Sequence, residues 1–242
     1  MIYLVFSDVH SNLESLERFI QMAEAIPHDK KVCLGDMVGY NTDPNEIVNW
    51  IRGNVDIVLA GNHDYGAVGM TDTSYFNDYA TKACIWTREK LSDKNRVYLR
   101  SLQVKHEEDG ILWVHSSPYE PDQWHYVNNK YDAQDNFPHF QNQCCFLGHS
   151  HKPMILELNP EGKVETIRDQ KYELKLGCRY LINVGSLGQP RDGNPDPSFV
   201  VYNSSTMMVE FKRYEYPLEV TQEKIRSAGL PFYLADRLEA GF

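Results

Sequence analysis

The sequence predicts an α/β fold, with a largely parallel sheet in its first half and antiparallel strands in its second. The first 64 of the 242 residues alternate short apolar runs with amphipathic segments, which is the spacing of βαβ units. After Pro153 the pattern changes to short strand-like runs separated by turn residues. No linker, low-complexity segment or internal repeat interrupts the chain, so we expect one domain over residues 1–242.

The first 64 residues are expected to form the parallel part of the sheet. Strands are predicted at Ile2–Phe6, Val32–Leu34 and Ile57–Ala60, and helices at Leu13–Ala25 and Pro44–Ile51, the latter stopped by Gly53. Each predicted strand is followed by a loop that carries Asp, His or Asn. Because ligands of open α/β sheets bind at the carboxyl ends of strands, we expect a site at these loops.

The middle of the chain combines helices with a long aromatic segment. Residues 75–102 have a mostly helical pattern, and strands are expected at Ile111–Val114 and Cys144–Leu147. Between these strands, residues 116–143 are polar and aromatic, with a short helix expected near Tyr131–Phe137. This segment can overhang a site and stack a nucleobase, or it can form a local core or a dimer contact.

After Pro153 we expect six short strands, mainly in antiparallel pairs, followed by a helical tail. The strands are Met154–Leu158, Val164–Ile167, Tyr172–Leu176, Tyr180–Val184, Phe199–Tyr202 and Met207–Tyr214, and the tail helices are Val220–Ala228 and Pro231–Glu239.

Composition limits the classes of function. The formal net charge of −10 argues against a nucleic-acid scaffold, which needs a basic face. The N-terminal sequence lacks the pattern of a secretory signal, and no run approaches the roughly 18 apolar residues of a membrane span. The five cysteines have no CxxC spacing, which favours reduced thiols. We therefore expect a cytoplasmic protein without membrane attachment.

Side chains that bind metals follow five of the predicted strands. They are Asp8 and His10, then Asp36, then Asn62, His63 and Asp64, then His115, and finally His149 and His151. All offer oxygen or nitrogen and none offers a thiolate, which suits Mn, Fe, Zn or Ni and not an iron–sulfur cluster. Even without His63 and Asp64, the remaining seven residues are too many for one divalent ion, so we expect two ions that share a carboxylate.

The spacing of these residues predicts how they converge. Residues that alternate as the chain leaves a strand point the same way, so Asp8 and His10 are expected to aim at one point. The same reasoning applies to His149 and His151. A glycine precedes three of the candidate positions, where it allows a sharp turn and a close approach of the backbone.

Each residue taken alone also has a purely structural explanation. Asp8 and Asp36 can cap helices, and Asn62 can occupy a left-handed turn. A single histidine at a strand end, such as His115, is often structural. We expect Asp64 to cap or hydrogen-bond a neighbour instead of binding metal.

Together the motifs resemble the calcineurin-like metallophosphoesterase superfamily. The matching blocks, in family order, are Asp8-Val9-His10, Gly35-Asp36, Gly61-Asn62-His63-Asp64, His115 and Gly148-His149-Ser150-His151. The resemblance implies a four-layer fold in which two mixed β-sheets are sandwiched between helices. It also implies that the strands after Pro153 contribute to the second sheet.

The resemblance further implies a ligand set and a mechanism. Asp8, His10 and His151 would bind the first metal ion, Asn62, His115 and His149 the second, and Asp36 both. A water or hydroxide between the ions would attack phosphorus. Asp36 and His63 would be catalytic, with His63 beside the phosphate as charge stabiliser or general acid. The implied activity is hydrolysis of a phosphoester or nucleotide phosphoanhydride bond, as a phosphatase or phosphodiesterase with two divalent ions, manganese among them.

Two other functions are weighed against this one. A sequence-nonspecific nuclease would be expected to carry a basic groove, whereas this chain is acidic. A metal-binding scaffold without catalysis would be expected to lack ligands, whereas every one is present. The sequence therefore favours a small phosphorylated substrate, with nucleotides included and nucleic acid disfavoured.

A second motif, Asn183-Val-Gly-Ser-Leu-Gly-Gln-Pro-Arg191, follows the metal-binding blocks. It resembles a segment of small prokaryotic phosphodiesterases and diadenosine-tetraphosphatase-like hydrolases. Arg191 can bind substrate, through a bidentate contact with phosphate or by stacking on a base. It can equally form an internal salt bridge with Asp192 or Asp196.

Overall fold

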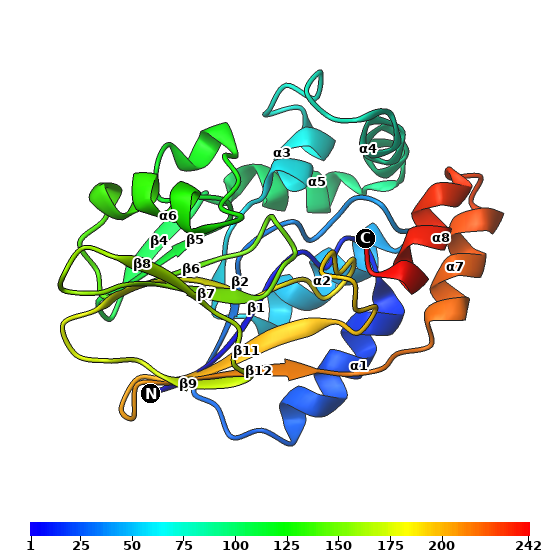
Figure 1. Ribbon diagram of the computed structural model, residues 1–242. Coiled ribbons are helices and arrows are strands. Elements are labelled where there is room, and N and C mark those ends of the chain that lie inside the picture. Colours follow the sequence, from blue (N-terminus) through cyan, green and yellow to red (C-terminus); the bar gives the residue numbers. More distant parts are fainter.

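The computed structural model describes all 242 residues and contains two six-stranded mixed sheets (Figure 1). The first sheet has the order β3-β2-β1-β11-β12-β9 and the second β4-β5-β6-β10-β7-β8. The strands are β1 (Ile2–Phe6), β2 (Lys30–Cys33), β3 (Ile57–Val58), β4 (Lys105–Glu108), β5 (Ile111–Val114), β6 (Cys144–Leu147), β7 (Met154–Leu158), β8 (Val164–Ile167), β9 (Lys171–Glu173), β10 (Arg179–Asn183), β11 (Ser198–Asn203) and β12 (Met208–Arg213).

Eight α-helices surround the sheets. They are α1 (Leu13–Glu24), α2 (Pro44–Asn54), α3 (Asn62–Val68), α4 (Asp78–Lys90), α5 (Asp93–Ser101), α6 (Lys130–Asn136), α7 (Leu218–Ser227) and α8 (Phe232–Ala240), with short 3₁₀ helices at Pro121–Gln123 and Phe137–His139. None of these helices has the length and apolar character needed to cross a membrane.

The first half of the chain forms the parallel pairs that its pattern predicts. Strands β1, β2 and β3 pair in parallel, with α1 and α2 as their crossovers. Helix α2 continues through Gly53 to Asn54, so the prediction that Gly53 stops it is wrong. The position is open to solvent, and a single glycine costs only about 1 kcal/mol in a helix whose other face is packed.

The strands after Pro153 divide between the two sheets. Strands β7, β8 and β10 join the second sheet, while β9, β11 and β12 extend the first. The expected antiparallel pairing is confirmed for every pair that these strands form with one another, and β10 also pairs in parallel with β6, which precedes Pro153. Strand β4 was not predicted, because its sequence KHEE lies on an edge and has no apolar residue.

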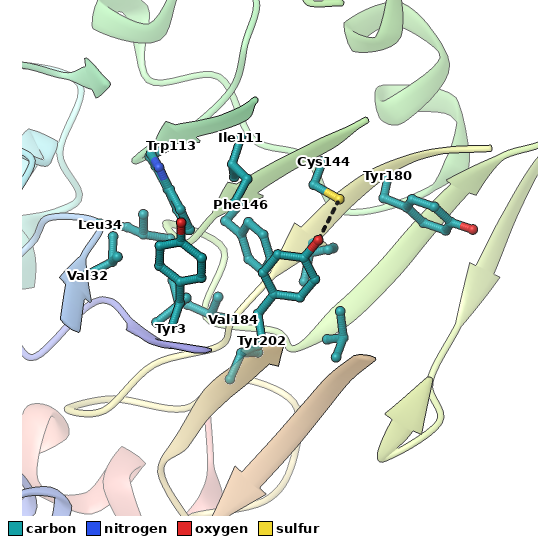
Figure 2. Packing of buried hydrophobic residues seen from close by; sticks show 14 of the residues in the cluster. Tyr3, Val32, Leu34, Ile111, Trp113, Cys144, Phe146, Tyr180, Val184 and Tyr202 are labelled. Atoms are coloured by element: carbon teal, nitrogen blue, oxygen red, sulfur yellow. Dashed lines mark hydrogen bonds between the residues drawn. The ribbon is translucent and has the colours of Figure 1, made fainter. Parts of the chain in front are cut away.

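The alternation of side chains on β1 shows how the layers are built. Tyr3 and Val5 face the second sheet, where they meet Trp113 and Phe146 in the core between the sheets (Figure 2). Leu4 and Phe6 face the other way and pack with residues of α1, α2 and α5. Helix α6 covers the outer face of the second sheet. The fold therefore has four layers, two sheets between helices, as predicted.

Candidate metal centre

The seven predicted ligands all lie just beyond the carboxyl ends of strands. Sheet one supplies four of them after β1, β2 and β3, and sheet two supplies three after β5 and β6. All seven are buried, with at most 7% of any residue exposed. The site therefore forms where corresponding ends of both sheets meet.

The first donor cluster consists of Asp8, His10 and His151. Nε2 of His151 lies 3.1 Å from Oδ1 of Asp8 and 3.2 Å from Nε2 of His10. Nε2 of His10 lies 3.7 Å from the same Asp8 oxygen. Three donor atoms that surround one point at these separations can share a single cation.

The second donor cluster consists of Asp36, His115 and His149. Nε2 of His115 lies 3.4 Å from Oδ2 of Asp36, and that oxygen is also 3.7 Å from Nε2 of His10 in the first cluster. One carboxylate oxygen thus lies next to donors of both clusters. Asn62 lies at the start of α3. Its Oδ1 is buried and accepts no hydrogen bond.

Both carboxylates are oriented by the main chain. The amide of His149 donates to Oδ2 of Asp8 at 3.0 Å, and the amide of His63 donates to Oδ1 of Asp36 at 2.8 Å. In each case the other oxygen faces the imidazole nitrogens. The chain therefore satisfies one oxygen of each carboxylate and presents the second to the cluster.

The histidine tautomers follow from the partners of the outer nitrogens. Nδ1 of His10, His115 and His151 faces the carbonyl oxygen of Val38, Leu34 and Gln189, respectively. Because a carbonyl can only accept, each Nδ1 carries the proton and each Nε2 of the neutral ring presents a lone pair. Metal-binding histidines are commonly held in this way.

Several buried atoms are left without the partner that a cation would supply. His115 Nε2 and Asn62 Oδ1 have no hydrogen bond, and the facing Nε2 atoms of His10 and His151 bring two lone pairs together. For His115, burial favours the neutral ring, but the Asp36 carboxylate outweighs it and raises the pKa to about 9. The Asp36 carboxylate therefore favours a positive charge next to Nε2 of His115. The donor set fits divalent transition-metal ions.

The backbone at these residues departs from the extended geometry that alternation assumes. Asp8, His10, Asp36, His149 and His151 all have φ between 48° and 62°. Asp8 and His10 still share one cluster, but His149 and His151 belong to different clusters, so the expectation that these two histidines aim at one point is wrong. Left-handed φ costs roughly 1–2 kcal/mol per residue, which the surrounding contacts must offset.

Close packing explains a glycine in two of these loops. A Cβ added at Gly148 would lie 2.5 Å from Oδ2 of Asp8, and one at Gly61 would lie 2.1 Å from Oδ1 of Asp36. Neither glycine has a positive φ. Gly61 is therefore required by the approach of the Asp36 carboxylate, Gly148 by the approach of the Ser7 side chain and the Asp8 carboxylate, and a sharp turn is not the reason.

The motif that ends in Arg191 holds the main chain at Asp8 and the ring of His151 in place. The amides of Leu187 and Gly188 donate to the carbonyl oxygens of Ser7 and Asp8 at 3.0 and 2.8 Å. The Gln189 carbonyl orients the His151 ring, as described above. The sequence motif therefore has a positioning role that its pattern did not reveal.

Arg191 itself has no carboxylate partner. Its Nη2 donates to Oε1 of Gln189 at 2.8 Å, and its guanidinium carbon lies 5.6 Å from the centre of the Tyr40 ring. Asp192 pairs instead with Arg213. The internal salt bridge considered for Arg191 is therefore not formed.

His63 and Asp64 follow Asn62 at the start of α3. The His63 ring lies 4.9 Å from the His10 ring, edge to face, and burial lowers its pKa to about 4, so the ring is neutral near pH 7. Asp64 accepts hydrogen bonds from the amides of Gly61 and Val38. It acts as a cap, as expected, and holds two metal-site loops together.

The aromatic segment 116–143 combines two of its predicted roles. Its tip reaches the second cluster, where Tyr126 stacks on His149 with ring centres 4.0 Å apart, and the Trp124 carbonyl faces Nε2 of His149 at 2.9 Å. Further along, Val127 and Phe137 join the core outside the second sheet. Part of the segment is thus a local core, and part overhangs the site.

A cavity of about 690 Å³ opens beside the second cluster. It is lined by two candidate ligands and by mainly aromatic and polar side chains: Asn62, Tyr65, Met70, Thr71, Asp72, Tyr75, Phe76, Asp122, Gln123, Trp124, His125, Tyr126 and His149. The residues from 65 to 76 were not expected here, because they carry no motif and are brought to the site by α3.

Comparison with known proteins places the chain in a family. Residues 1–207 match the model of the calcineurin-like phosphoesterase superfamily domain. A protein of Methanocaldococcus jannaschii is 36% identical over 241 residues, covering 98% of this chain and 97% of that protein. The crystal structure of a metallophosphoesterase from Sphaerobacter thermophilus is 36% identical, with a TM-score of 0.87 over 100% of this chain and 99% of that one.

A more distant protein has the same fold. A hypothetical protein from Pyrococcus horikoshii is 18% identical and superposes with a TM-score of 0.81 over 100% of this chain and 98% of that chain. The match of the family model extends over most of the sequence and includes all seven candidate ligands. This chain belongs to the calcineurin-like phosphoesterase superfamily and is a phosphoric ester hydrolase with two clusters of metal-binding side chains.

Proposed function

We propose that this phosphoesterase holds two divalent transition-metal ions, one in each donor cluster, and hydrolyses a phosphoester or nucleotide phosphoanhydride bond. The observation that carries the proposal is the position of Asp36. Its Oδ2 lies 3.4 Å from a nitrogen of the second cluster and 3.7 Å from one of the first. A single carboxylate oxygen between two donor sets is suited to bridging two cations.

The ligands would divide between the ions as the clusters do. Asp8, His10 and His151 would hold one ion, Asn62, His115 and His149 the other, and Asp36 both. Two such ions supply Lewis-acid polarisation of the phosphoryl oxygens and lower the pKa of water for attack on phosphorus. Mn, Fe, Zn and Ni all fit these donors, with manganese our choice for the assay.

We assign His63 a role toward substrate and not toward metal. Its amide already fixes Asp36, while its ring Nδ1 is buried without a hydrogen-bond partner. The neutral ring can donate a hydrogen bond from its N–H to a phosphoryl oxygen, whereas it would have to be protonated first to give a proton to the leaving group. Arg191, which has no acidic side chain as partner, would add a charged contact with phosphoryl oxygens of the substrate.

The aromatic cavity favours a substrate with a planar organic part, such as a nucleotide. Tyr65, Phe76, Trp124 and Tyr126 line it next to Asn62 of the second cluster. Base-on-aromatic stacking contributes roughly 1–3 kcal/mol. A candidate diadenosine tetraphosphatase shares the fold at 12% identity and a TM-score of 0.55 over 88% of this chain, which agrees with nucleotides as substrates.

All five cysteines are free and buried, which supports the proposed cytoplasmic location.

The proposal is tested with protein loaded with Mn²⁺, by assaying p-nitrophenyl phosphate and bis-p-nitrophenyl phosphate. Asp36→Asn should lower both metal content and turnover, the latter by about 100-fold or more. His63→Ala should slow turnover by roughly 100-fold while both ions stay bound. Metal content is measured by mass spectrometry, and Asp93→Asn, an exposed helix-terminal aspartate, is the matched control.

Two outcomes contradict the proposal. Full activity of Asp36→Asn, or of the wild type in excess chelator, would exclude the two-metal mechanism. Loss of one ion in His63→Ala would make His63 a ligand. A panel of monoester, diester, cyclic nucleotide and dinucleoside polyphosphate then ranks the substrates.

A further inference from the structure

Two arginines from distant parts of the chain meet at Tyr40, beside the first donor cluster. The guanidinium carbons of Arg191 and Arg237 lie 5.6 and 6.0 Å from the centre of the Tyr40 ring. That ring lies 4.7 Å from the His10 ring and 4.5 Å from the His63 ring. Helix α8 therefore brings a second cation to the edge of the site.

Neither arginine is neutralised by an acidic side chain. Arg191 donates to the Gln189 side chain, and Nε of Arg237 donates to the main-chain oxygen of Phe242. The contrast with their neighbours is informative, because Arg213 pairs with Asp192 and Arg226 pairs with Asp236. In a chain with a net charge of −10, the two neighbouring guanidinium groups thus have no acidic side chain as partner; Nε of Arg237 is held by the terminal residue Phe242, and its Nη nitrogens have no hydrogen-bond partner.

The two guanidinium groups also repel each other. Burial and then the positive charge of Arg191 lower the pKa of Arg237. Two like charges that are held together, partly removed from water and not paired with an acidic side chain, favour binding of an anion. Arginine suits phosphoryl oxygens in particular, because its planar fork can donate two parallel hydrogen bonds.

Helix α8 is fixed in place, so Arg237 does not depend on a flexible tail. Leu234 and Leu238 pack with Ala80 and Ala83 of α4 and with Tyr40 itself in one apolar cluster. Figure 1 shows α7 and α8 at one side of the molecule, with the end of the chain turned back toward the sheets. The ring that the arginines share thus also anchors the helix that supplies one of them.

The arginines and the aromatic cavity adjoin different donor clusters. The arginines lie by His10 of the first cluster, whereas the cavity is lined by Asn62 and His149 of the second. A substrate whose scissile phosphoryl group lies at the centre would therefore extend in two directions. One end would meet aromatic side chains and the other would meet two positive charges.

We propose that Arg191 and Arg237 together bind a second phosphoryl group of the substrate, linked to the one that is cleaved. The preferred substrates then carry two or more linked phosphoryl groups, as nucleoside and dinucleoside polyphosphates do. This inference rests on the proposed function and adds Arg237 as a residue that determines substrate specificity.

The kinetic test compares substrates with one and with several phosphoryl groups. Protein loaded with Mn²⁺ is assayed with p-nitrophenyl phosphate, ATP and diadenosine tetraphosphate. Arg237→Gln should lower kcat/KM for the two polyphosphates by about 10- to 100-fold, the loss expected for charge-assisted hydrogen bonds, and change that for p-nitrophenyl phosphate less than about 3-fold. Arg237→Lys should recover part of the loss, because it keeps the charge without the fork.

The matched control is Arg226→Gln on α7, which removes the same charge from a residue already paired with Asp236. It should leave both classes of substrate unchanged. An equal loss for all substrates in Arg237→Gln, or no loss for any, would overturn the inference. So would a wild-type enzyme that cleaves p-nitrophenyl phosphate but neither cleaves nor is inhibited by the polyphosphates.

A second measurement does not depend on catalysis. Inorganic pyrophosphate should raise the melting temperature of metal-free wild-type protein more than orthophosphate does, and Arg237→Gln should abolish that difference while Arg226→Gln keeps it. A wild type that hydrolyses no phosphoester with Mn²⁺ contradicts the proposed function alone. A wild type that shows no preference for pyrophosphate contradicts the arginine site alone.

Discussion

At the scale of single residues, the buried polar groups fall into two kinds. Those of the donor clusters include atoms without partners, such as Asn62 Oδ1 and His115 Nε2. Glu157 on β7 is of the other kind, since its buried carboxylate accepts from the hydroxyls of Tyr172 and Tyr180 and from Nζ of Lys175. Tyr172 belongs to the first sheet and Tyr180 to the second, so this carboxylate joins the two sheets.

Glu157 gives a prediction about stability and pH. Burial would raise its pKa, but its three hydrogen bonds outweigh burial and hold the pKa below the ordinary value of 4.5. The stabilisation is therefore present above pH 4.5 and is lost as the pH falls through the lowered value. Glu157→Gln should lower the free energy of unfolding by about 1–3 kcal/mol at pH 7, with a smaller difference toward pH 3. Urea titrations at several pH values measure this.

The control for that experiment is Glu165→Gln. Glu165 lies opposite Glu157 in the pairing of β7 with β8, but its side chain is half exposed and meets only Lys163. The substitution should change stability by less than about 0.5 kcal/mol. A Glu157→Gln penalty that stays constant from pH 7 to pH 3 would contradict the explanation.

At the scale of elements, the loop after β1 and the segment after β10 form one unit. Gly188 lies against the Asp8–His10 loop, and a Cβ added there would be 1.9 Å from the carbonyl oxygen of Val9. The loop carries two donors of the first cluster, and the segment orients the third, His151. A change in one of these elements is therefore transmitted to all three donors.

Gly188→Ala should consequently damage the first cluster selectively. We expect bound Mn²⁺ to fall from two ions per chain toward one, with turnover reduced about 10- to 100-fold. Gly53→Ala is the control, since that position on α2 has open space around it and should keep both ions. If Gly188→Ala kept both ions at wild-type affinity, the Asp8–His10 loop would tolerate being moved by the added Cβ, and the expected selective damage would be contradicted.

The sequence was most informative where function depends on short local patterns. The seven candidate ligands were predicted because each follows a buried strand, and the alternation of Tyr3, Leu4, Val5 and Phe6 between two faces accounts for the layers. The division of His149 and His151 between clusters could not be derived from alternation, because both have left-handed backbone conformations. Asp and His are enriched in left-handed conformations, but tertiary contacts decide which of them adopt one, so the sequence does not identify these positions.

Residues brought to the site by packing were beyond prediction for a similar reason. Tyr40 and Arg237 belong to no motif, and their proximity arises from the packing of α8 against α4. The pairing of β10 with β6 was missed because the short apolar run at residues 180–182 does not specify the direction of its neighbour.

At the scale of the whole molecule, the donor clusters connect the two sheets. The first cluster joins β1 of the first sheet with β6 of the second, and the second cluster joins β2 with β5 and β6. Ions bound there stabilise the folded chain, because the unfolded chain has no such arrangement of donors. That residues 1–242 unfold as one domain stays a prediction.

Metal removal should therefore lower the melting temperature. Free Mn²⁺ at 100 times its Kd adds about 2.7 kcal/mol per site, which for a chain of this size corresponds to about 5–10 °C. Scanning calorimetry with Mn²⁺ and with excess chelator measures the difference. Mg²⁺, which prefers oxygen ligands, should produce a smaller rise, and Asp36→Asn should lose most of the rise with Mn²⁺. Equal melting temperatures with and without chelator would contradict metal binding by the folded state.

The pairing of the first strand with the eleventh has a consequence for synthesis on the ribosome. Tyr3 lies opposite Tyr202, and His10 meets His151. At roughly 5–20 residues per second, about 10–40 s pass between the emergence of β1 and that of its antiparallel partner. During that interval one edge of β1 is open, and both donor sets stay incomplete until His149 and His151 have emerged. Metal can therefore be acquired in full only after β6 and the loop that follows it have been made, and the Gln189 carbonyl that orients His151 emerges later still.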